Sequence, residues 1–257
     1  MSDPELLYEV KGHTAWITLN REVRRNALSL DMIDRFYESL DKAEADTSVR
    51  VVCVTGAGEK AFCSGADLAG TLGGEETLAG ARKYAGLLKK LAVFGKPLVA
   101  KVNGHCVAGG MGLLLSCDIA YARNEAKFGT PEVNVGLFPM MIAALIFRNA
   151  SRKKALEMIY TARMLSAAEA EEMGLITRAV PAEEFDRVVN ETLEAVASKA
   201  PLAISLGRRA MAHVDAVSLP EALDHLCEQL SVVAKTEDAM EGLTAFLQKR
   251  KPEWKGR

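Results

Sequence analysis

The sequence predicts an α/β protein with parallel strands, completed by a helical region at its C-terminal end. In the first two-thirds of the chain, apolar strand-like runs alternate with segments of helical periodicity, which is typical of strand–helix–strand units. From about Phe138 onward the pattern is almost entirely helical. A length of 257 residues suits one large domain, and a change in composition near residue 200 separates a predicted core, 1–200, from a helical region, 201–257.

Four strands are expected in the first part of the chain, because their residues favour extended structure and polar or glycine-containing loops follow several of them. They are His13–Leu19, Val49–Thr55, Pro97–Val102 and Asp118–Ala122.

Helix boundaries are predicted by capping residues. Ser29 suits the N-cap of a helix whose apolar residues recur at helical spacing, and residues 166–169 and 218–221 both fit the capping-box pattern. The last helix is expected over about 237–249. Residues 70–80 hold four glycines and predict either a mobile lid or a surface excursion, with equal weight.

Composition excludes several classes of protein. A net charge of −2 gives no electrostatic case for binding nucleic acid or a membrane surface, and no apolar run is long enough to span a bilayer. The acidic N-terminus lacks the apolar core of a secretory signal, so a cytoplasmic location is expected. The five cysteines lie among apolar residues and are expected to be reduced and buried. No histidine or cysteine spacing indicates a metal site.

Three motifs carry the candidate chemistry. Lys60–Leu68 (KAFCSGADL) and Asn103–Gly112 (NGHCVAGGMG) each place glycine where the backbone can approach a ligand closely. Phe128–Val133 (FGTPEV) supplies a carboxylate. Together they resemble the two oxyanion loops and the catalytic-glutamate segment of the crotonase (enoyl-CoA hydratase/isomerase) superfamily, and the similarity extends over nearly the whole chain.

This resemblance implies a spiral core of repeated ββα units and a C-terminal helical trimerisation region, in trimers that often pair into hexamers. The apolar residues expected to cover neighbouring subunits are Leu202, Leu206, Leu223, Leu226, Leu230, Leu243 and Phe246. The competing interpretation is a monomer in which these helices fold back on their own core.

The resemblance also assigns catalytic roles. The backbone N–H groups of Ala66 and Gly109 would grip the thioester carbonyl and stabilise an enolate-like oxygen. Glu132 would be the general acid/base, with a pKa raised by its apolar neighbours. Gly112 stands where the hydratases of the family carry a second glutamate. One carboxylate can move a proton but cannot easily activate a water as well. A glutamate restored at 112 is therefore expected to raise hydration, unless the surrounding Met140 and Met141 side chains block it.

Contacts to the acyl-CoA substrate are implied less directly. Arg24 and Arg25 lie in the segment that approaches the CoA phosphates in relatives, although solvated surface arginines fit equally well. The remaining expected substrate-binding residues are Ala66, Asp67, Leu68, Gly112, Met140, Met141, Phe246 and Lys249. Met140 and Met141 replace smaller residues of the family pattern and would either reshape the acyl pocket or fill core. Phe246 and Lys249 would reach CoA in part from a neighbouring subunit.

The function expected from these features is double-bond isomerisation of an enoyl-CoA, with coenzyme A as part of the substrate and no separate cofactor. An atypical enoyl-CoA hydratase is the first alternative, and a hydrolase or decarboxylase on the same scaffold is a weaker one. A non-catalytic acyl-CoA-binding paralogue is favoured by the lost carboxylate and opposed by Glu132 and the two glycine loops.

Overall fold

Two sheets organise the computed structural model, which describes residues 3–66, 75–214 and 217–257. The larger has six strands in the order β1-β2-β3-β5-β7-β10, and the smaller has four in the order β4-β6-β8-β9. In the larger sheet β1 runs antiparallel to β2, and all other neighbours are parallel. In the smaller sheet β9 runs antiparallel to β8, and the other pairs are parallel.

The strands and helices have the following bounds. The strands of the larger sheet are β1 (Leu6–Lys11), β2 (Thr14–Leu19), β3 (Val51–Gly56), β5 (Leu98–Val102), β7 (Ile119–Arg123) and β10 (Arg178–Val180). Those of the smaller sheet are β4 (Ala61–Cys63), β6 (His105–Val107), β8 (Lys127–Gly129) and β9 (Leu165–Ser166). The 3₁₀ helices are η1 (Glu22–Arg24) and η2 (Pro131–Val135). The α-helices are α1 (Leu30–Ala45), α2 (Glu75–Ala92), α3 (Gly109–Leu115), α4 (Met140–Asn149), α5 (Arg152–Thr161), α6 (Ala167–Glu172), α7 (Ala182–Ala197), α8 (Pro201–Val214), α9 (Leu219–Val233) and α10 (Glu237–Leu247).

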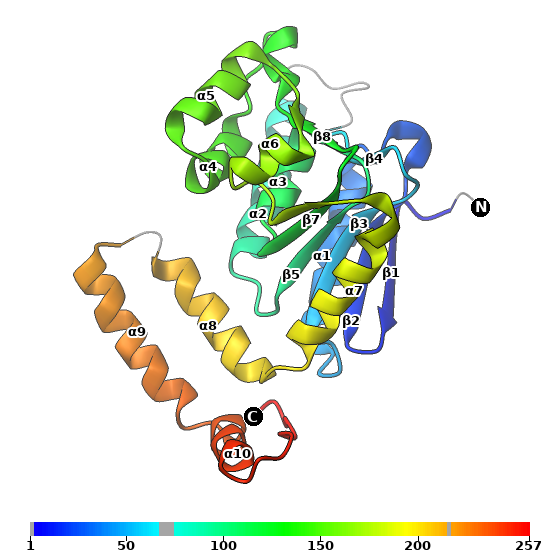
Figure 1. Cartoon of the computed structure of the whole chain (residues 1–257). Helices are drawn as coiled ribbons and strands as arrows, with labels where there is room; N and C mark the ends of the chain where they lie inside the picture. The colour runs from blue at the N-terminus through cyan, green and yellow to red at the C-terminus, as the bar shows by residue number, and fades with distance from the viewer. Residues whose placement is uncertain (1–2, 67–74, 215–216) are drawn as a thin grey trace.

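The core repeats one unit along the chain. A strand of the larger sheet is followed by a short strand of the smaller sheet and then by a helix: β3, β4 and α2, then β5, β6 and α3, then β7, β8 and the 3₁₀ helix η2. This arrangement confirms the expected spiral of ββα units (Figure 1). It also places the segments that follow β4, β6 and β8 at one edge of the smaller sheet, since these strands run parallel.

Side chains on the central strand β3 pack alternately into two apolar clusters, one on each face of the larger sheet. Val52 and Val54 join the main cluster, which includes Phe36 of α1. Val51 and Cys53 point the other way, into a cluster formed with α7. Figure 1 shows α7 lying across that face. A strand buried on both faces is expected for a parallel sheet covered by helices, and it explains the continuous apolar run of the sequence.

The four predicted strands are confirmed as β2, β3, β5 and β7, with ends within two residues of the expected ones. Ser29 caps α1 by accepting a hydrogen bond from the Met32 backbone N–H, and Ser166 and Glu169 form the predicted capping box. Of the segment predicted as a lid or surface excursion, 67–74 lie outside the described residues, and α2 begins at Glu75.

Several details of the sequence prediction were wrong. The short strands β4, β6 and β8 have three residues each, too few to show a periodicity, and β9 and β10 interrupt the segment expected to be helical. Ser218 precedes α9 but makes no capping hydrogen bond. Cys227 is exposed on α9, although Cys53, Cys63 and Cys106 are buried as expected.

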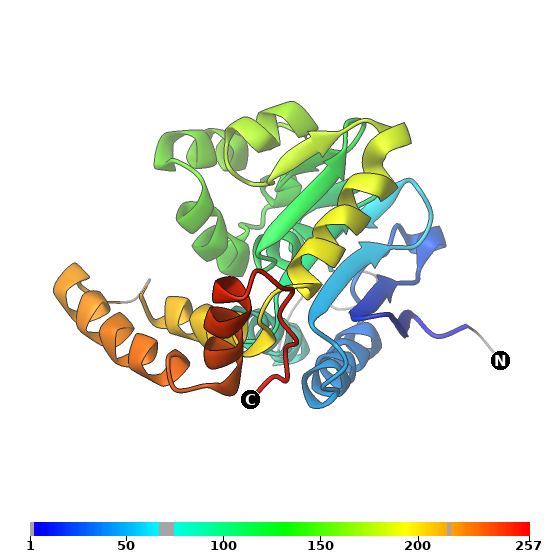
Figure 2. The ribbon, with the colours of Figure 1, turned by 60° about the horizontal axis from the view of Figure 1, so that its bottom comes forward.

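The C-terminal helices extend away from the two sheets, as Figures 1 and 2 show from different sides. Arg208 attaches α8 to the core by an ion pair of 2.8 Å with Asp118 and a hydrogen bond of 2.9 Å to the Leu91 carbonyl. Large apolar side chains remain exposed beyond this attachment, including Leu230 (68% exposed) and Phe246 (79%). No helix in the described parts of the chain is both long and apolar enough to span a bilayer.

Candidate active site

The buried side chain of Asn26 fixes the first glycine loop against the N-terminal segment. Its amide nitrogen donates to the carbonyl oxygens of Ala61 (2.8 Å) and Ala57 (3.0 Å), on either side of the turn before β4. The Leu28 backbone N–H then donates to the Gly65 carbonyl at 2.7 Å. Because Asn26 is fully buried, these bonds are shielded from water and hold the loop in one position.

The two glycine loops meet backbone to backbone. Gly65 has φ +92, and a Cβ there would lie 2.7 Å from the Ala108 Cβ and 2.8 Å from the Gly109 nitrogen. A Cβ on Gly109 would in turn lie 3.3 Å from the Ala66 nitrogen. Only glycine allows both the positive φ and this approach. The structure therefore brings together the N–H groups of Ala66 and Gly109, two residues that are 43 positions apart in the sequence.

Ala108, at the N-cap of α3, has a strained backbone. Its φ of 48 and ψ of −128 lie in a region that non-glycine residues rarely occupy. Such strain costs about 1–3 kcal/mol and persists only where the surroundings impose it, most often at functional sites. Here the Ala108 N–H donates to the Gly129 carbonyl at 3.0 Å, which ties the second glycine loop to the segment that leads to Glu132.

Glu132 lies half-buried in η2, and its Oε2 is buried without a hydrogen-bond partner among the described residues. Burial raises the pKa of this carboxyl group above its ordinary value of 4.5, because desolvation disfavours the charged form. Thr130, two residues earlier, is fully buried, and its hydroxyl oxygen likewise has no partner in the described ranges. Burial of a carboxylate oxygen with no partner in the described parts of the chain destabilises the charged form and leaves this oxygen able to exchange a proton with a ligand.

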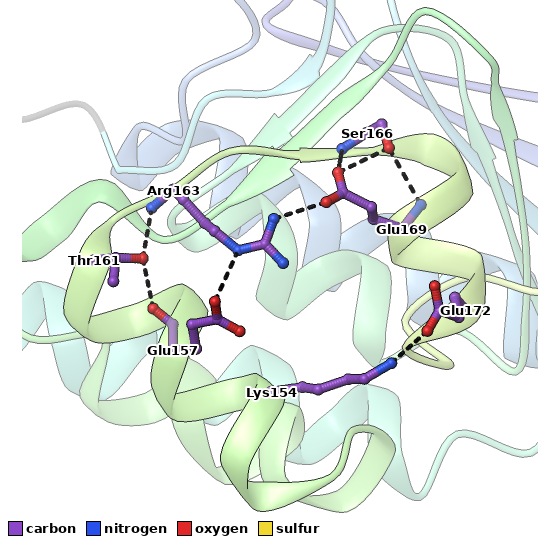
Figure 3. A network of polar contacts seen from close by, with 7 residues as sticks. All are labelled: Lys154, Glu157, Thr161, Arg163, Ser166, Glu169 and Glu172. Carbon is purple, nitrogen blue, oxygen red and sulfur yellow. Dashed lines mark hydrogen bonds and ion pairs between the residues drawn. The ribbon is translucent and has the colours of Figure 1, made fainter.

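A polar network supports the strand that flanks this segment (Figure 3). β9 pairs with β8, and the Ser166 backbone N–H at its end donates to Glu169 at 2.7 Å. Arg163 donates to Glu169 at 2.7 Å, and its Nε lies 3.9 Å from Glu157, an ion pair beyond hydrogen-bond range. The Ser166 hydrogen bonds and Arg163 lower the pKa of Glu169 to about 2. Capping box and ion pair together fix the corner between α5 and α6.

Gly112 is buried in α3, and a tyrosine hydroxyl fills the space beside it. A Cβ on Gly112 would lie 2.1 Å from the Tyr84 Oη and 3.4 Å from a methyl group of Leu88, both on α2. The Tyr84 hydroxyl donates a hydrogen bond to the Gly109 carbonyl. Tyr84 was missed in the sequence because it is far from all three motifs along the chain and meets Gly112 only through the fold.

The other predicted substrate contacts are distributed more widely. Arg24 and Arg25 are exposed beside the first glycine loop, and the Arg25 carbonyl accepts from the Ser64 N–H at 3.1 Å. Met140 is 71% exposed at the start of α4, whereas Met141 packs against the main apolar cluster. Met141 thus fits the core-filling alternative. Asp67 and Leu68 lie outside the described residues.

Phe246 and Lys249 are not brought to Glu132 within one chain. α10 packs on α8 and lies apart from β4 and α3 in Figure 1. Any contact of these two residues with a ligand at the glycine loops would have to come from a neighbouring subunit.

Two nearby features are distinct from the place where Ala66, Gly109 and Glu132 lie. Burial raises the pKa of Cys63 to about 12 and that of Cys106 well above its usual range, so neither is a thiolate nucleophile at neutral pH. A pocket of about 370 Å³ is lined by Arg25, Lys60 and His105 among others, but it includes none of Ala66, Gly109 and Glu132.

Known proteins match the chain over nearly its full length. A sequence model described as enoyl-CoA hydratase/isomerase matches residues 9–257. A putative enoyl-CoA hydratase of Thermus thermophilus is 35% identical and aligns over 94% of this chain and 97% of its own length. The short-chain-enoyl-CoA hydratase of Clostridium acetobutylicum is 33% identical, with 96% of each chain aligned. The crystal structure of an enoyl-CoA hydratase from Bacillus anthracis superposes with a TM-score of 0.93 at 33% identity, over 98% of this chain and 100% of that one.

Proposed function

The chain belongs to the enoyl-CoA hydratase/isomerase family, and from this premise we propose that it isomerises the double bond of an enoyl-CoA thioester with Glu132 as the single proton-transferring group. The observation that carries the proposal is the contrast between the two carboxylate positions. Glu132 has a buried carboxylate oxygen with no hydrogen-bond partner in the ranges that the structure describes, whereas position 112 holds a glycine beside a tyrosine hydroxyl.

The proposed reaction needs one base and a stabilised enolate. The N–H groups of Ala66 and Gly109 donate to the thioester oxygen as negative charge develops on it. The Glu132 carboxylate removes the proton from C2, and the C2–H electron pair moves into the conjugated enolate. The C1–O bond re-forms its double bond as electrons shift to C4, which takes the proton back from Glu132. The product is the 2-enoyl thioester, and no water is consumed.

A glutamate with a raised pKa suits this cycle. The same group must accept a proton and then release it, so a pKa nearer to neutral pH brings both steps closer to balance. The close packing of Gly65 against the second glycine loop also supports isomerisation through an enolate, since it holds the Ala66 and Gly109 backbones near each other before substrate binds.

Hydration is the second candidate, because two of the relatives named above are called enoyl-CoA hydratases. In this chain it would need a water activated without a carboxylate at position 112. A non-catalytic acyl-CoA-binding role is the third candidate. The buried Glu132 oxygen, which has no partner within the described part of the chain, argues against it.

For substrate binding and assembly, we propose that the CoA portion lies along Arg24 and Arg25 and is completed by Phe246 and Lys249 of a neighbouring subunit. The exposed apolar side chains of α9 and α10 support a trimer or a dimer of trimers, since patches of this kind commonly mark protein interfaces. Light scattering at micromolar concentration tests the assembly: a mass close to the single-chain 27.8 kDa would contradict it.

The activity is tested by offering the purified protein a 3-enoyl-CoA, crotonyl-CoA and a saturated acyl-CoA, with Glu132→Gln as the matched control. We expect the wild-type protein to convert the 3-enoyl thioester and the Glu132→Gln protein to bind it without converting it. Binding of all three thioesters without turnover by the wild-type protein would favour the non-catalytic candidate.

A further inference from the structure

The hydroxyl of Tyr84 occupies the volume in which a side chain on residue 112 would begin. A Cβ on Gly112 would lie 2.1 Å from the Tyr84 Oη and 3.2 Å from its Cζ. Real Cβ atoms do not approach an oxygen so closely, so Tyr84 in its present position and any side chain at 112 exclude each other. Glycine at 112 and tyrosine at 84 are thus parts of one packing arrangement.

Tyr84 is more than a filler of this space. It is 7% exposed, and its hydroxyl donates to the carbonyl of Gly109, the residue whose N–H belongs to the proposed oxyanion site. Burial, together with the nearby Cys63, Cys106 and Glu132 groups, raises the pKa of the Tyr84 hydroxyl well above its ordinary value of 10.0. The group therefore stays neutral at physiological pH and acts as a hydrogen-bond donor rather than as a base.

We propose that Tyr84 is a positioning and specificity-determining residue. Its hydroxyl occupies the position of the second carboxylate and excludes a water-activating side chain from it. The same hydroxyl holds the Gly109 peptide in position through its hydrogen bond. This inference rests on the proposed function, because it explains why one carboxylate suffices. It also corrects the expectation that a glutamate restored at 112 would by itself raise hydration. The atoms that a Cβ at 112 meets first belong to Tyr84 and Leu88.

The chain contains a matched control for this arrangement. Tyr37 on α1 places its hydroxyl 2.6 Å from where a Cβ on Gly86 would lie and donates to the Lys83 carbonyl at 3.3 Å. It therefore fills the space beside a helical glycine in the same manner as Tyr84, but on the side of α2 that faces α1. Tyr37→Phe should change stability without changing kinetics.

The first experiment is a thermal-unfolding cycle of four proteins: wild type, Tyr84→Phe, Gly112→Ala and the double variant. We expect Gly112→Ala to lower Tm in the wild-type background and to lower it by less than half as much in the Tyr84→Phe background, since residues in contact are energetically coupled. Additive Tm changes would overturn the claim that the two residues share one space. This cycle needs no turnover, so its outcome is independent of the proposed reaction.

The second experiment separates positioning from packing. For isomerisation of a 3-enoyl-CoA, Tyr84→Phe should lower kcat by about tenfold or more with KM changed by less than about threefold, while Tyr37→Phe changes neither. Equal kinetics for the two phenylalanine variants would reduce Tyr84 to a packing residue and overturn the positioning role. If Glu132→Gln also retained full turnover, the proposed function would fail as well; if Glu132→Gln were inactive, only the role of Tyr84 would fail.

The third experiment tests specificity. Hydration of crotonyl-CoA should be at least about tenfold faster in Tyr84→Ala/Gly112→Glu than in Gly112→Glu, because only the double variant has room for the carboxylate. Equal hydration by the two variants would show that Tyr84 does not control access to this position.

Discussion

Glu132 and Gly112 stand at the two positions where the family resemblance predicts a carboxylate, and their surroundings in the structure differ. Glu132 lies in a short 3₁₀ helix, and one of its carboxylate oxygens has no hydrogen-bond partner among the residues placed by the structure. Gly112 lies within α3, where every residue from Gly110 to Leu115 is buried and the neighbouring space is filled. A buried carboxylate at the first position has a cost in stability, whereas close packing at the second leaves no room for a side chain.

The difference extends to what fixes each position. Gly112 is held by direct packing of α3 against Tyr84 and Leu88. Glu132 is held indirectly, through the Ala108–Gly129 hydrogen bond and the pairing of β8 with β9. Changes at 112 should therefore act mainly on folding, and changes at 132 mainly on catalysis. The predictions below test this division.

The largest expected effect is that of Glu132→Gln. Removal of a general acid/base lowers kcat by about 10²–10⁴-fold, while the affinity for acyl-CoA should change little because other groups bind it. Steady-state kinetics and a direct binding measurement on the same variant check both parts. A variant with more than about a tenth of the wild-type kcat would remove Glu132 from the mechanism.

Gly112→Glu should act in the opposite sense, on stability before activity. The new side chain meets the Tyr84 hydroxyl and brings a charge into a buried helix, and we expect a loss of about 3 kcal/mol or more in the free energy of unfolding. Urea unfolding of this variant, with Gly207→Ala on the open side of α8 as the control, measures it. A Gly112→Glu protein as stable as the wild type would mean that α2 can move away freely.

The pH dependence of catalysis should reveal the burial of Glu132. The base must be ionised to accept a proton, so kcat/KM falls as pH decreases through the pKa of this group, by up to about tenfold per pH unit. Since burial raises that pKa, the decline should begin at a higher pH than for a solvated glutamate with its ordinary value of 4.5. A flat profile down to pH 4.5 would contradict the raised pKa.

A smaller effect is expected at the corner that supports β9. Ser166→Ala removes the N-cap of α6 and should lower the free energy of unfolding by about 1 kcal/mol.

The pH dependence of stability at this corner follows from Glu169, whose folded pKa of about 2 lies below its unfolded value. The stabilisation is present above pH ~4.5 and is lost as pH falls towards 2. Thermal unfolding from pH 6 to 3 should therefore show a weaker pH dependence in Glu169→Gln than in the wild type.

Sequence and structure agree where the signal is local. The strands around Val52 and Ala100 and the cap at Ser29 follow from runs of adjacent residues. The catalytic role of Glu132 was expected from the family resemblance and stays a prediction. The convergence of Ala66 with Gly109 was expected only from a family resemblance, since no local pattern relates two loops 43 positions apart. Nothing in the sequence indicated the role of Tyr84. Its partner is a glycine, and a glycine in a sequence does not reveal which side chain packs against it.

The central claim is that a single carboxylate moves a proton without activating water. It is tested most directly by following one 3-enoyl-CoA with the wild-type protein by mass spectrometry and measuring the initial rates of both products. The account predicts that the 2-enoyl isomer, equal in mass to the substrate but separable by chromatography, forms at least about tenfold faster than the hydrated 3-hydroxyacyl product. Formation of the 3-hydroxyacyl-CoA as fast as the isomer would contradict it. Hydration of crotonyl-CoA, measured separately, at a rate above that of isomerisation would contradict it too.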